Sequence, residues 1–361
     1  MPTDPSQQTI AFYLNHPAHY HLFKNVINRL IKRSFCVKVV IVSKDVLADL
    51  VAREPWDVVN IFPEGRRSKK LPSILSLPFY FLKTEWRLWK VMRRLKPDII
   101  IGTEGTIAHT GFILGIPTAL FNEDDTHATP ENYLFYPFAT RIFVPACCDV
   151  GHWHKKITYQ GYHELAYLHP HYFRADEYVL DELGLKDKNY FILRLAELSA
   201  SHDLGKKGIS NELALKIIST LNNYGEVFIS SERDLPDDLK RYRLKIAPHQ
   251  MLDVLYSAQM YIGDSQTMAA EAAVMGTPSL RFNDFAGKLG YLEELEDIYE
   301  LTYGFNTHQE KRFLDKIRSL LQMPHLKQHW KNKAKIMLVE KIDVTMFMMV
   351  MIEEMLKGKG R

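Results

Sequence analysis

The residues best suited to ligand chemistry lie between Gly263 and Met268, where the sequence reads Gly-Asp-Ser-Gln-Thr-Met. An apolar segment at 260–262 precedes them, and an Ala-rich helical segment follows at 269–275. A short polar loop that opens into a helix presents free backbone N–H groups and the positive end of the helix dipole at one point, which suits a phosphate group. We therefore predict a phosphate site at this loop.

Glu271 extends the predicted site toward a nucleotide. It is the only acid on the Ala-rich helix, and its carboxylate is placed to accept hydrogen bonds from the two hydroxyls of a ribose. Arg281, near the end of the next apolar segment, is expected to add a fixed positive charge close to the phosphates. The predicted nucleotide-diphosphate site thus comprises Gly263, Asp264, Ser265, Gln266, Thr267, Met268, Glu271 and Arg281.

Two further loops are expected at the same edge of a parallel sheet. One follows an apolar strand at 190–195 and contains Ser199 and His202, and the other follows a strand at 227–230 and begins with Ser231. Ligands of such sheets bind at the carboxyl ends of the strands. We expect the two serines to contact the diphosphate and His202 to act as a catalytic residue that stabilises the leaving group.

The N-terminal half carries its own polar loops, which follow strands expected at 10–14, 98–102 and 118–121. The predicted general bases are Asp124, Glu123 and His16, in that order. The predicted substrate contacts are Asn15, His19, Glu104 and Asp125. The alternative interpretation is structural, because histidines at a strand end can cap or pack beneath the following helix and consecutive acids favour a helix start.

We expect no metal site. Consecutive acids on one loop, such as Glu123 to Asp125, rarely supply a full shell of ligands. The histidines between His152 and His171 match no common zinc spacing. The three cysteines, two of them adjacent, form neither a disulfide framework nor a zinc motif, which fits a reducing cytoplasm.

The loops need strands and helices to position them. Apolar strands alternate with helical segments along the chain, a pattern typical of parallel, doubly wound sheets. The 361 residues, of which 46% are hydrophobic, suffice for two cores. We predict an α/β protein with Rossmann-like domains at 1–165 and 166–335, followed by a C-terminal helical segment at 336–361.

The stretch 66–96 differs from the rest of the chain in charge. It holds ten basic residues and one acid, Glu85, and so has a local net charge of +9 in a chain whose net charge is +3. Aromatic residues on the same helical segment suggest that it rests on an anionic membrane surface. The alternative is an ordinary amphipathic helix with a solvated face. We expect no nucleic acid partner, because no recognised binding motif accompanies the charge.

The expected location follows from what the sequence does not contain. The N-terminus shows no charged start followed by an apolar core, so we expect no signal peptide. The longest apolar runs are too short to span a bilayer. We expect a cytoplasmic protein, with peripheral association at the inner face of the cytoplasmic membrane if the stretch 66–96 binds lipid.

The residues from Pro248 to Asn283 resemble a segment of the bacterial UDP-N-acetylglucosamine 2-epimerases. The matching positions are Asp264, Ser265, Glu271, Gly276, Pro278 and Arg281, and His202 falls in the loop where the epimerases carry a site histidine. Over its whole length the chain is more similar to the domain-of-unknown-function family 354. The motifs are Asn15-His16-Pro17, Ser201-His202-Asp203, Gly263-Asp264-Ser265-Gln266-Thr267-Met268 and Lys341-Ile342-Asp343-Val344-Thr345.

The resemblance implies a glycosyltransferase-B fold, in which two Rossmann-like domains face each other across a cleft and a C-terminal helix returns to the first domain. The peptidoglycan N-acetylglucosaminyltransferase shares this fold. The implied co-substrate is a nucleotide sugar, with UDP as the favoured nucleotide, and no cofactor or metal is implied. The chain departs from the epimerases by lacking their His-Arg-Arg-Glu-Asn run after Leu195 and by carrying Gln266 and Thr267 in place of paired glycines.

The expected function is therefore that of a metal-independent glycosyltransferase. It would move a sugar from a nucleotide-sugar donor to a glycan or lipid-linked acceptor in the synthesis of a cell-envelope polysaccharide or glycolipid. One alternative is a sugar-nucleotide epimerase, which needs no acceptor. Another is a non-catalytic module that binds a sugar nucleotide or a membrane.

Overall fold

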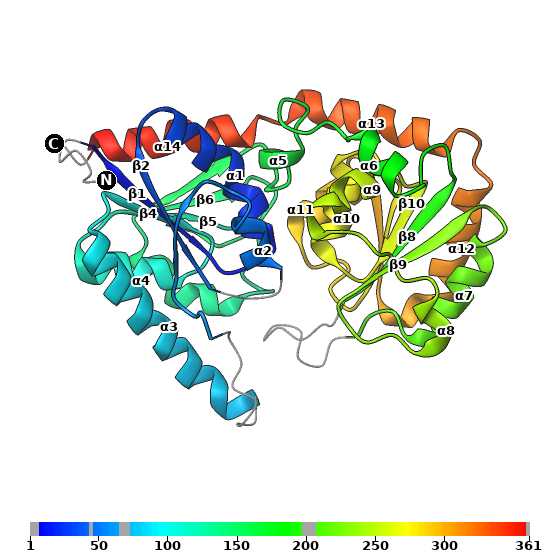
Figure 1. Cartoon of the computed structure of the whole chain (residues 1–361), viewed down its shortest axis with the longest axis horizontal. Coiled ribbons are helices and arrows are strands. Elements are labelled where there is room, and N and C mark those ends of the chain that lie inside the picture. The colour runs from blue at the N-terminus through cyan, green and yellow to red at the C-terminus, as the bar shows by residue number, and fades with distance from the viewer. Residues whose placement is uncertain (1–6, 43–45, 65–72, 197–206, 359–361) are drawn as a thin grey trace. The chain divides into compact units, whose positions relative to one another are not determined.

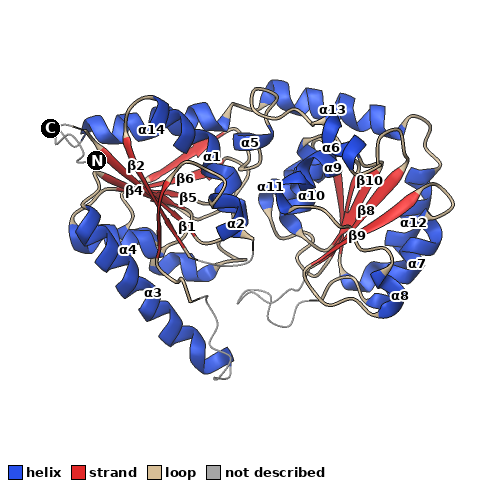
Figure 2. Ribbon diagram, viewed as in Figure 1, coloured by secondary structure: helices blue, strands red, loops and turns tan. Residues whose placement is uncertain are grey.

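The computed structural model describes residues 7–42, 46–64, 73–196 and 207–358, with the backbone alone for residues 73–78. The chain forms two compact units. Unit 1 comprises Met1–Tyr167 and Ile342–Arg361, and unit 2 comprises Leu168–Lys341. Each unit is a parallel sheet with helices packed on it (Figures 1 and 2). The predicted α/β class with two Rossmann-like domains is confirmed.

The sheet of unit 1 has the strand order β3-β2-β1-β4-β5-β6-β7, and every pair is parallel. The strands are β1 (Thr9–Leu14), β2 (Cys36–Ile41), β3 (Asp57–Asn60), β4 (Ile99–Gly102), β5 (Thr118–Phe121), β6 (Arg141–Pro145) and β7 (Lys156–Tyr159). The order of the strands reverses between β1 and β4. In doubly wound sheets such a switch point opens a crevice at the carboxyl ends of the strands.

The helices of unit 1 cover both faces of this sheet. They are α1 (Pro17–Lys32), α2 (Leu47–Val51), α3 (Ser73–Leu95), α4 (Thr106–Leu114), α5 (Leu165–Leu168) and α14 (Val344–Gly358), with short 3-10 helices η1 (Pro130–Leu134) and η2 (Tyr136–Phe138). Helix α14 at the end of the chain lies beside α1 (Figure 1). The Thr345 hydroxyl donates to the carbonyl of Ala166 at 2.7 Å. The expected return of the C-terminal helix to the first domain is confirmed.

The sheet of unit 2 has the order β12-β11-β10-β8-β9, again parallel throughout. Its strands are β8 (Tyr190–Leu195), β9 (Glu226–Ser231), β10 (Met260–Gly263), β11 (Ser279–Phe282) and β12 (Thr302–Phe305). Its helices are α6 (Glu177–Glu182), α7 (Asn211–Leu221), α8 (Asp237–Lys240), α9 (Met251–Ser257), α10 (Gln266–Val274), α11 (Gly290–Asp297), α12 (Glu310–Leu321) and α13 (Leu326–Glu340), with η4 (Pro248–Gln250) and η5 (Thr307–Gln309). The switch point of this sheet lies between β8 and β10.

Helix α10 is the helix of unit 2 that carries the predicted site, and it is deeply enclosed. Every residue from Met268 to Val274 is buried, and the Ala side chains let the helix approach the sheet closely. The Ser279 hydroxyl of β11 donates to the carbonyl of Ala269 at 2.9 Å. At the far end, Gly276 has a φ of 71°, and a Cβ there would lie 3.0 Å from the Cα of Lys331. Glycine is therefore required at this helix end.

Candidate functional site

The switch point of unit 2 places two loops side by side. Strands β8 and β10 are neighbours, and Arg194 near the end of β8 is in register with Gly263, the last residue of β10. The loops that begin at Ala196 and Asp264 therefore leave the same edge of the sheet. The chain from Gly263 to Met268 forms the expected strand end, loop and helix start. The structure thus brings this loop to the position where doubly wound sheets bind their ligands.

The N-terminus of α10 exposes the amides that the sequence predicts for a phosphate. Ser265 is the N-cap, and its hydroxyl oxygen accepts the N–H of Met268 at 3.4 Å. The amides of Gln266 and Thr267 belong to the first helical turn, which has no preceding carbonyl within the helix to receive them. The Tyr261 hydroxyl donates to the carbonyl of Ser265 at 3.2 Å and so helps to fix the N-cap residue. Ser265 therefore caps the helix, and the two amides after it remain for a ligand.

Asp264 has a different role from the one predicted. Its side chain is buried, and its two carboxylate oxygens accept the N–H of Ala196 at 2.7 Å and the N–H of Ile209 at 3.2 Å. A Cβ on Gly208 would lie 2.6 Å from its Oδ2, so the backbone approaches the carboxylate closely. Burial raises the pKa of Asp264 to about 6. The carboxylate joins strand ends and loop backbone and does not face a ligand, which corrects the prediction of direct binding.

The predicted charge of Arg281 is also used inside the protein. The side chain is fully buried, and its Nη2 lies 2.9 Å from Oε2 of Glu296 and 3.3 Å from Oε1 of Glu293. Both acids belong to α11. Arg281 of β11 points at this helix. Residues alternate between the two faces of a strand, so its position near a strand end did not reveal which face its side chain would take. The expectation that it supplies charge near the phosphates is therefore corrected.

Two other arginines lie at this edge and were missed from the sequence. Arg194 donates from Nη1 to the hydroxyl of Ser230 at 2.7 Å and pairs with Glu232. Arg233 donates from Nη2 to the carbonyl of Ile209 at 2.6 Å. Both arginines could have been predicted as site residues from their positions at or just after strand ends, because β8 and β9 were expected from their apolar runs.

Asn283 and Asp284 complete the edge and were also missed. The Asn283 amide donates to the carbonyl of Asp264 at 2.9 Å. Asp284 accepts the N–H of Lys207 at 2.9 Å on Oδ2 and the Thr307 hydroxyl at 2.6 Å on Oδ1. The signal was an Asn-Asp pair immediately after an apolar strand. These contacts tie the carboxyl ends of β10, β11 and β12 together.

The remaining predicted residues of unit 2 have distinct surroundings. Ser231 forms a local turn, because its hydroxyl donates to the carbonyl of Arg233 at 2.8 Å and accepts the N–H of the same residue at 3.2 Å. Glu271 is 6% exposed. Burial raises the pKa of Tyr261, and the carboxylates of Asp264 and Glu271 raise it further. Ser199 and His202 lie outside the described residues.

In unit 1 the loops at the β1–β4 switch point meet at His19. Its Nε2 lies 2.7 Å from the Thr103 hydroxyl, and its Nδ1 lies 3.4 Å from the backbone N of Asn15. Glu104 follows Thr103 and is half-buried. His16 is exposed and is the N-cap of α1, where its Nδ1 accepts the N–H of Ala18 at 3.2 Å. The structural interpretation of these histidines, as helix caps, therefore applies to His16.

The three acids after β5 divide into different environments. Asp125 is buried, and its Oδ1 accepts the N–H of Asp149 at 2.5 Å, so it holds two loops together and does not face a substrate as predicted. Asp124 is half-buried. The burial of Tyr136 and the negative charge of Asp124 both raise the pKa of Tyr136. Glu123 faces His163, whose Nδ1 lies 3.3 Å from Oε2. His163 was not predicted as a site residue.

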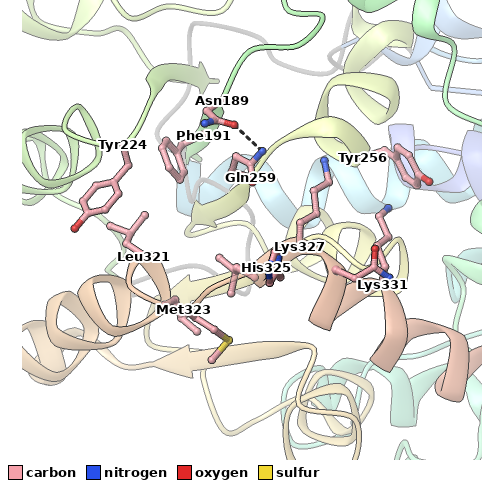
Figure 3. Close-up of a pocket in the computed structure, with 13 residues that line it drawn as sticks. Asn189, Phe191, Tyr224, Tyr256, Gln259, Leu321, Met323, His325, Lys327 and Lys331 are labelled. Atoms are coloured by element: carbon pink, nitrogen blue, oxygen red, sulfur yellow. Dashed lines mark hydrogen bonds between the residues drawn. The ribbon is translucent and has the colours of Figure 1, made fainter.

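A separate cavity of about 650 Å³ lies at the opposite, amino edge of the unit 2 sheet (Figure 3). Asn189 before β8 and Gln259 before β10 line it, and the Gln259 amide donates to Oδ1 of Asn189 at 3.0 Å. Lys327 donates to the carbonyl of Ser257 at 2.5 Å, and Lys331 donates to that of Met275 at 2.7 Å. These lysines therefore cap the C-terminal ends of α9 and α10.

Residues 13–289 match the model of a family described as a protein of unknown function (DUF354). The chain belongs to this family. It is similar to an uncharacterised protein of Methanocaldococcus jannaschii, with 26% identity over 205 residues, which span 54% of this chain and 59% of that protein. It is also similar to the pyrophosphoryl-undecaprenol N-acetylglucosamine transferase of Pseudomonas fluorescens, with 32% identity over 98 residues. Those residues span 26% of this chain and 27% of the transferase.

Solved structures share the fold of this DUF354 protein over nearly its whole length. The UDP-GlcNAc 2-epimerase of Neisseria meningitidis, bound to UDP-GlcNAc, has a TM-score of 0.62 at 13% identity and covers 97% of this chain and 100% of its own. A spinosyn rhamnosyltransferase complexed with thymidine diphosphate has a TM-score of 0.62 at 10% identity, covering 95% and 100%. The expected glycosyltransferase-B fold is confirmed. No helix among the described residues is long and apolar enough to cross a membrane.

We predict that Asp264 makes the stability of unit 2 pH-dependent. Its pKa in the fold, about 6, lies above the ordinary value of 3.8, so the folded state holds the proton more tightly than the unfolded state. Its stabilising contribution is full at low pH and is lost as the pH rises through about 6. Relative to Asp264→Asn, the wild type should lose up to about 3 kcal/mol of unfolding free energy between about pH 4 and pH 7.

Chemical unfolding of both proteins across this pH range measures the difference. Asp237→Asn is the matched control, because the Asp237 side chain is 91% exposed and the substitution should leave the pH dependence unchanged. A difference between wild type and Asp264→Asn that stays constant with pH would show that the buried carboxyl is not the titrating group.

Proposed function

We propose that this protein is a glycosyltransferase that moves a sugar from a nucleotide-sugar donor, with UDP as the favoured nucleotide, to an acceptor. The observation that carries the proposal is the loop Gly263–Met268, which opens into α10 at the switch point of unit 2. A helix N-terminus at such a point suits a diphosphate. The fold neighbours bound to UDP-GlcNAc and to thymidine diphosphate support the same class of ligand.

Unit 2 supplies the donor-binding groups in this proposal. The amides of Gln266 and Thr267 bind the diphosphate, and Glu271 accepts hydrogen bonds from the ribose. Arg233 provides positive charge at the same edge, in the role first expected of Arg281, and Arg194 lies at this edge in an ion pair with Glu232. Ser199 and His202 are kept as proposed contacts on the strength of the sequence. Fixed N–H donors and cations stabilise the negative charge that develops on the leaving diphosphate, without requiring a metal.

Unit 1 supplies the acceptor-binding groups. Asn15, His19 and Glu104 lie at the β1–β4 switch point, and Asp124 lies after the neighbouring strand β5. Transfer requires that the acceptor hydroxyl lose its proton as its oxygen attacks the anomeric carbon and the bond to the diphosphate breaks. Asp124 is the first base proposed from the sequence, and the residue is half-buried in the structure.

Epimerisation is the second candidate, favoured by the epimerase-like Asp264, Ser265 and Glu271 and by the shared fold. Transfer is preferred because the epimerases' His-Arg-Arg-Glu-Asn run is absent after Leu195, and because similarity to the N-acetylglucosamine transferases extends over 98 residues. The products separate the two functions. An epimerase isomerises the sugar nucleotide when no acceptor is present, whereas a transferase releases nucleotide and lengthens a glycan or lipid-linked acceptor.

We predict that Glu271→Ala weakens UDP binding at least tenfold, because a charged hydrogen bond to the ribose contributes about 1.5 kcal/mol or more. Isothermal titration calorimetry measures the affinity, and product analysis with and without a lipid-linked acceptor measures transfer. Glu212→Ala is the matched control, since Glu212 is an exposed acid on α7 of the same unit. Unchanged affinity in a folded Glu271→Ala protein would remove the ribose assignment and with it the donor site.

We further propose that unit 1 rests on an anionic membrane surface, which would make the acceptor lipid-linked and the protein peripheral at the inner face of the cytoplasmic membrane. The apolar part of this surface joins α3, α4 and the two 3-10 helices. Its members are more than half exposed, and they are Phe79, Leu82, Trp86, Phe112, Ile113 and Leu134. Ring contacts connect the elements, including Phe112 to Phe138 at 5.1 Å and Phe81 to Phe135 at 5.9 Å.

The basic part of the surface includes fewer cations than the sequence suggested. Lys83 and Arg87 both turn back to Glu64, at 3.2 and 2.7 Å, and the Arg87 guanidinium also donates to a backbone carbonyl at 2.6 Å. The exposed cations are Lys90, Arg93, Arg94 and Lys96. The Lys90 ammonium lies 5.3 Å from the exposed Trp86 ring, so charge and apolar surface adjoin. This combination fits anionic lipid. Residues 65–72 lie outside the described part of the chain.

We predict that the triple variant Lys90→Glu, Arg93→Glu, Arg94→Glu lowers binding to anionic vesicles at least tenfold, because each cation near such a surface contributes about 1 kcal/mol. Co-sedimentation with vesicles of mixed anionic and zwitterionic lipid measures it, and purely zwitterionic vesicles should bind weakly. The control reverses Lys311, Arg312 and Arg318 on α12, which changes the net charge equally. Equal loss in both variants would indicate that only net charge matters, and no loss would exclude this membrane surface.

A further inference from the structure

The carboxylate of Glu123 and the ring of His163 form a pair at the carboxyl edge of the unit 1 sheet. Glu123 lies two residues after β5, and His163 lies four residues after β7, with β6 between these strands. Oε2 of Glu123 lies 3.3 Å from both Nδ1 and the backbone N of His163. The acid therefore holds the histidine at two points, through its ring and through its main chain. Both residues belong to unit 1.

This arrangement sets which ring nitrogen of His163 can accept a proton. A carboxylate beside Nδ1 favours the tautomer in which Nδ1 carries the hydrogen and donates it to Oε2. Nε2 then carries a free lone pair, which is the form of histidine that acts as a base. The same carboxylate stabilises the imidazolium that forms once Nε2 is protonated, as an acid does in a carboxylate–histidine pair.

Nε2 of His163 has no hydrogen-bond partner among the described residues, although His163 is only 8% exposed and this atom is covered. Buried polar atoms almost always have a partner, so an oxygen that can donate a hydrogen bond is expected at this position. A water molecule meets the requirement, since it needs little room and can hydrogen-bond to a second group.

Several other titratable groups surround the Glu123–His163 pair. Burial and the charge of Glu123 raise the pKa of Tyr159, and a hydrogen bond to Cys147 together with burial raises the pKa of Cys148, so both stay protonated at neutral pH. Asp125 is held by the amide of Asp149. Glu164 also lies near Tyr159.

We propose that His163, oriented by Glu123, is the base that receives the proton of the acceptor hydroxyl through one bound water. This rests on the proposed transferase function and places the base at His163 in preference to Asp124. The acceptor O–H bond breaks, and its proton passes to the water while a proton of that water passes to Nε2. The acceptor oxygen forms the new bond to the anomeric carbon while the bond between that carbon and the diphosphate oxygen breaks, and the electron pair of this carbon–oxygen bond leaves with the nucleotide diphosphate. Glu123 is a positioning residue in this step.

The test uses the full-length protein with a nucleotide sugar that the wild type transfers. His163→Gln should lower kcat at least 100-fold, because a general base contributes roughly that factor, while KM for the donor and the affinity for UDP stay within about twofold. Glu123→Gln should lower kcat by about tenfold and shift the acid limb of the pH profile to lower pH, since the imidazolium loses the carboxylate that stabilises it. His154→Gln is the matched control, because His154 is exposed at the amino end of β7.

Each outcome decides the question. If folded His163→Gln retains kcat within about threefold, or Glu123→Gln leaves the acid limb unchanged, His163 is not the base and its Nε2 holds a structural water only. If His163→Gln does not fold, the Glu123→Gln pH profile alone decides. Failure of the proposed function looks different: the wild type then transfers no sugar to any acceptor, and the base assignment falls with it.

Discussion

The buried carboxylate of Asp264 is the interaction on which the proposed donor site depends. Its two oxygens hold the amides of Ala196 and Ile209, and its own carbonyl accepts the side chain of Asn283. These contacts join the ends of three strands at the point where Ser265 begins α10. A negatively charged group buried here would ordinarily be costly, and the amide hydrogen bonds reduce that cost. Loss of the carboxylate would release the loop that presents the amides of Gln266 and Thr267.

In both units the proposed binding site lies where the strand order of the sheet reverses, but the two sites suit different ligands. In unit 2 the strand order reverses at β8 and β10, where backbone amides and arginines gather. In unit 1 it reverses at β1 and β4, where His19 joins the two loops through Thr103. Amides and cations suit phosphate, while histidine, amide and carboxylate side chains suit sugar hydroxyls. This difference in chemistry is why we assign donor and acceptor to different units.

Much of the fold could be predicted from the sequence, because apolar runs bounded by turn residues are strong local signals. The central strands β1, β4, β8 and β10 follow this pattern. The four-residue strands β3, β7 and β12 did not stand out, since all three are edge strands with mostly half-exposed residues. Residues 244–246 form no strand, and the preceding Arg243 makes only an isolated bridge to Ile229.

The candidate site was less predictable, because residue type and strand position do not fix the direction of a side chain. Asp264 and Arg281 were expected to face a ligand, yet both are buried and paired with the protein's own groups. His163 could not be found, since its partner Glu123 is 40 residues away along the chain. By contrast, Ser265 and α10 were found because a helix start is encoded by consecutive residues.

The central claim is that a nucleotide diphosphate binds at the N-terminus of α10, and the amides there report on it directly. Titration of ¹⁵N-labelled protein with UDP, followed by transverse-relaxation-optimised amide spectra, measures which backbone groups the ligand approaches. We expect the largest shifts at Gln266, Thr267 and Met268, because their N–H groups would donate to the diphosphate oxygens. Shifts confined to the cavity beside Lys327 and Lys331, or saturation of binding without change at these three amides, would contradict the account.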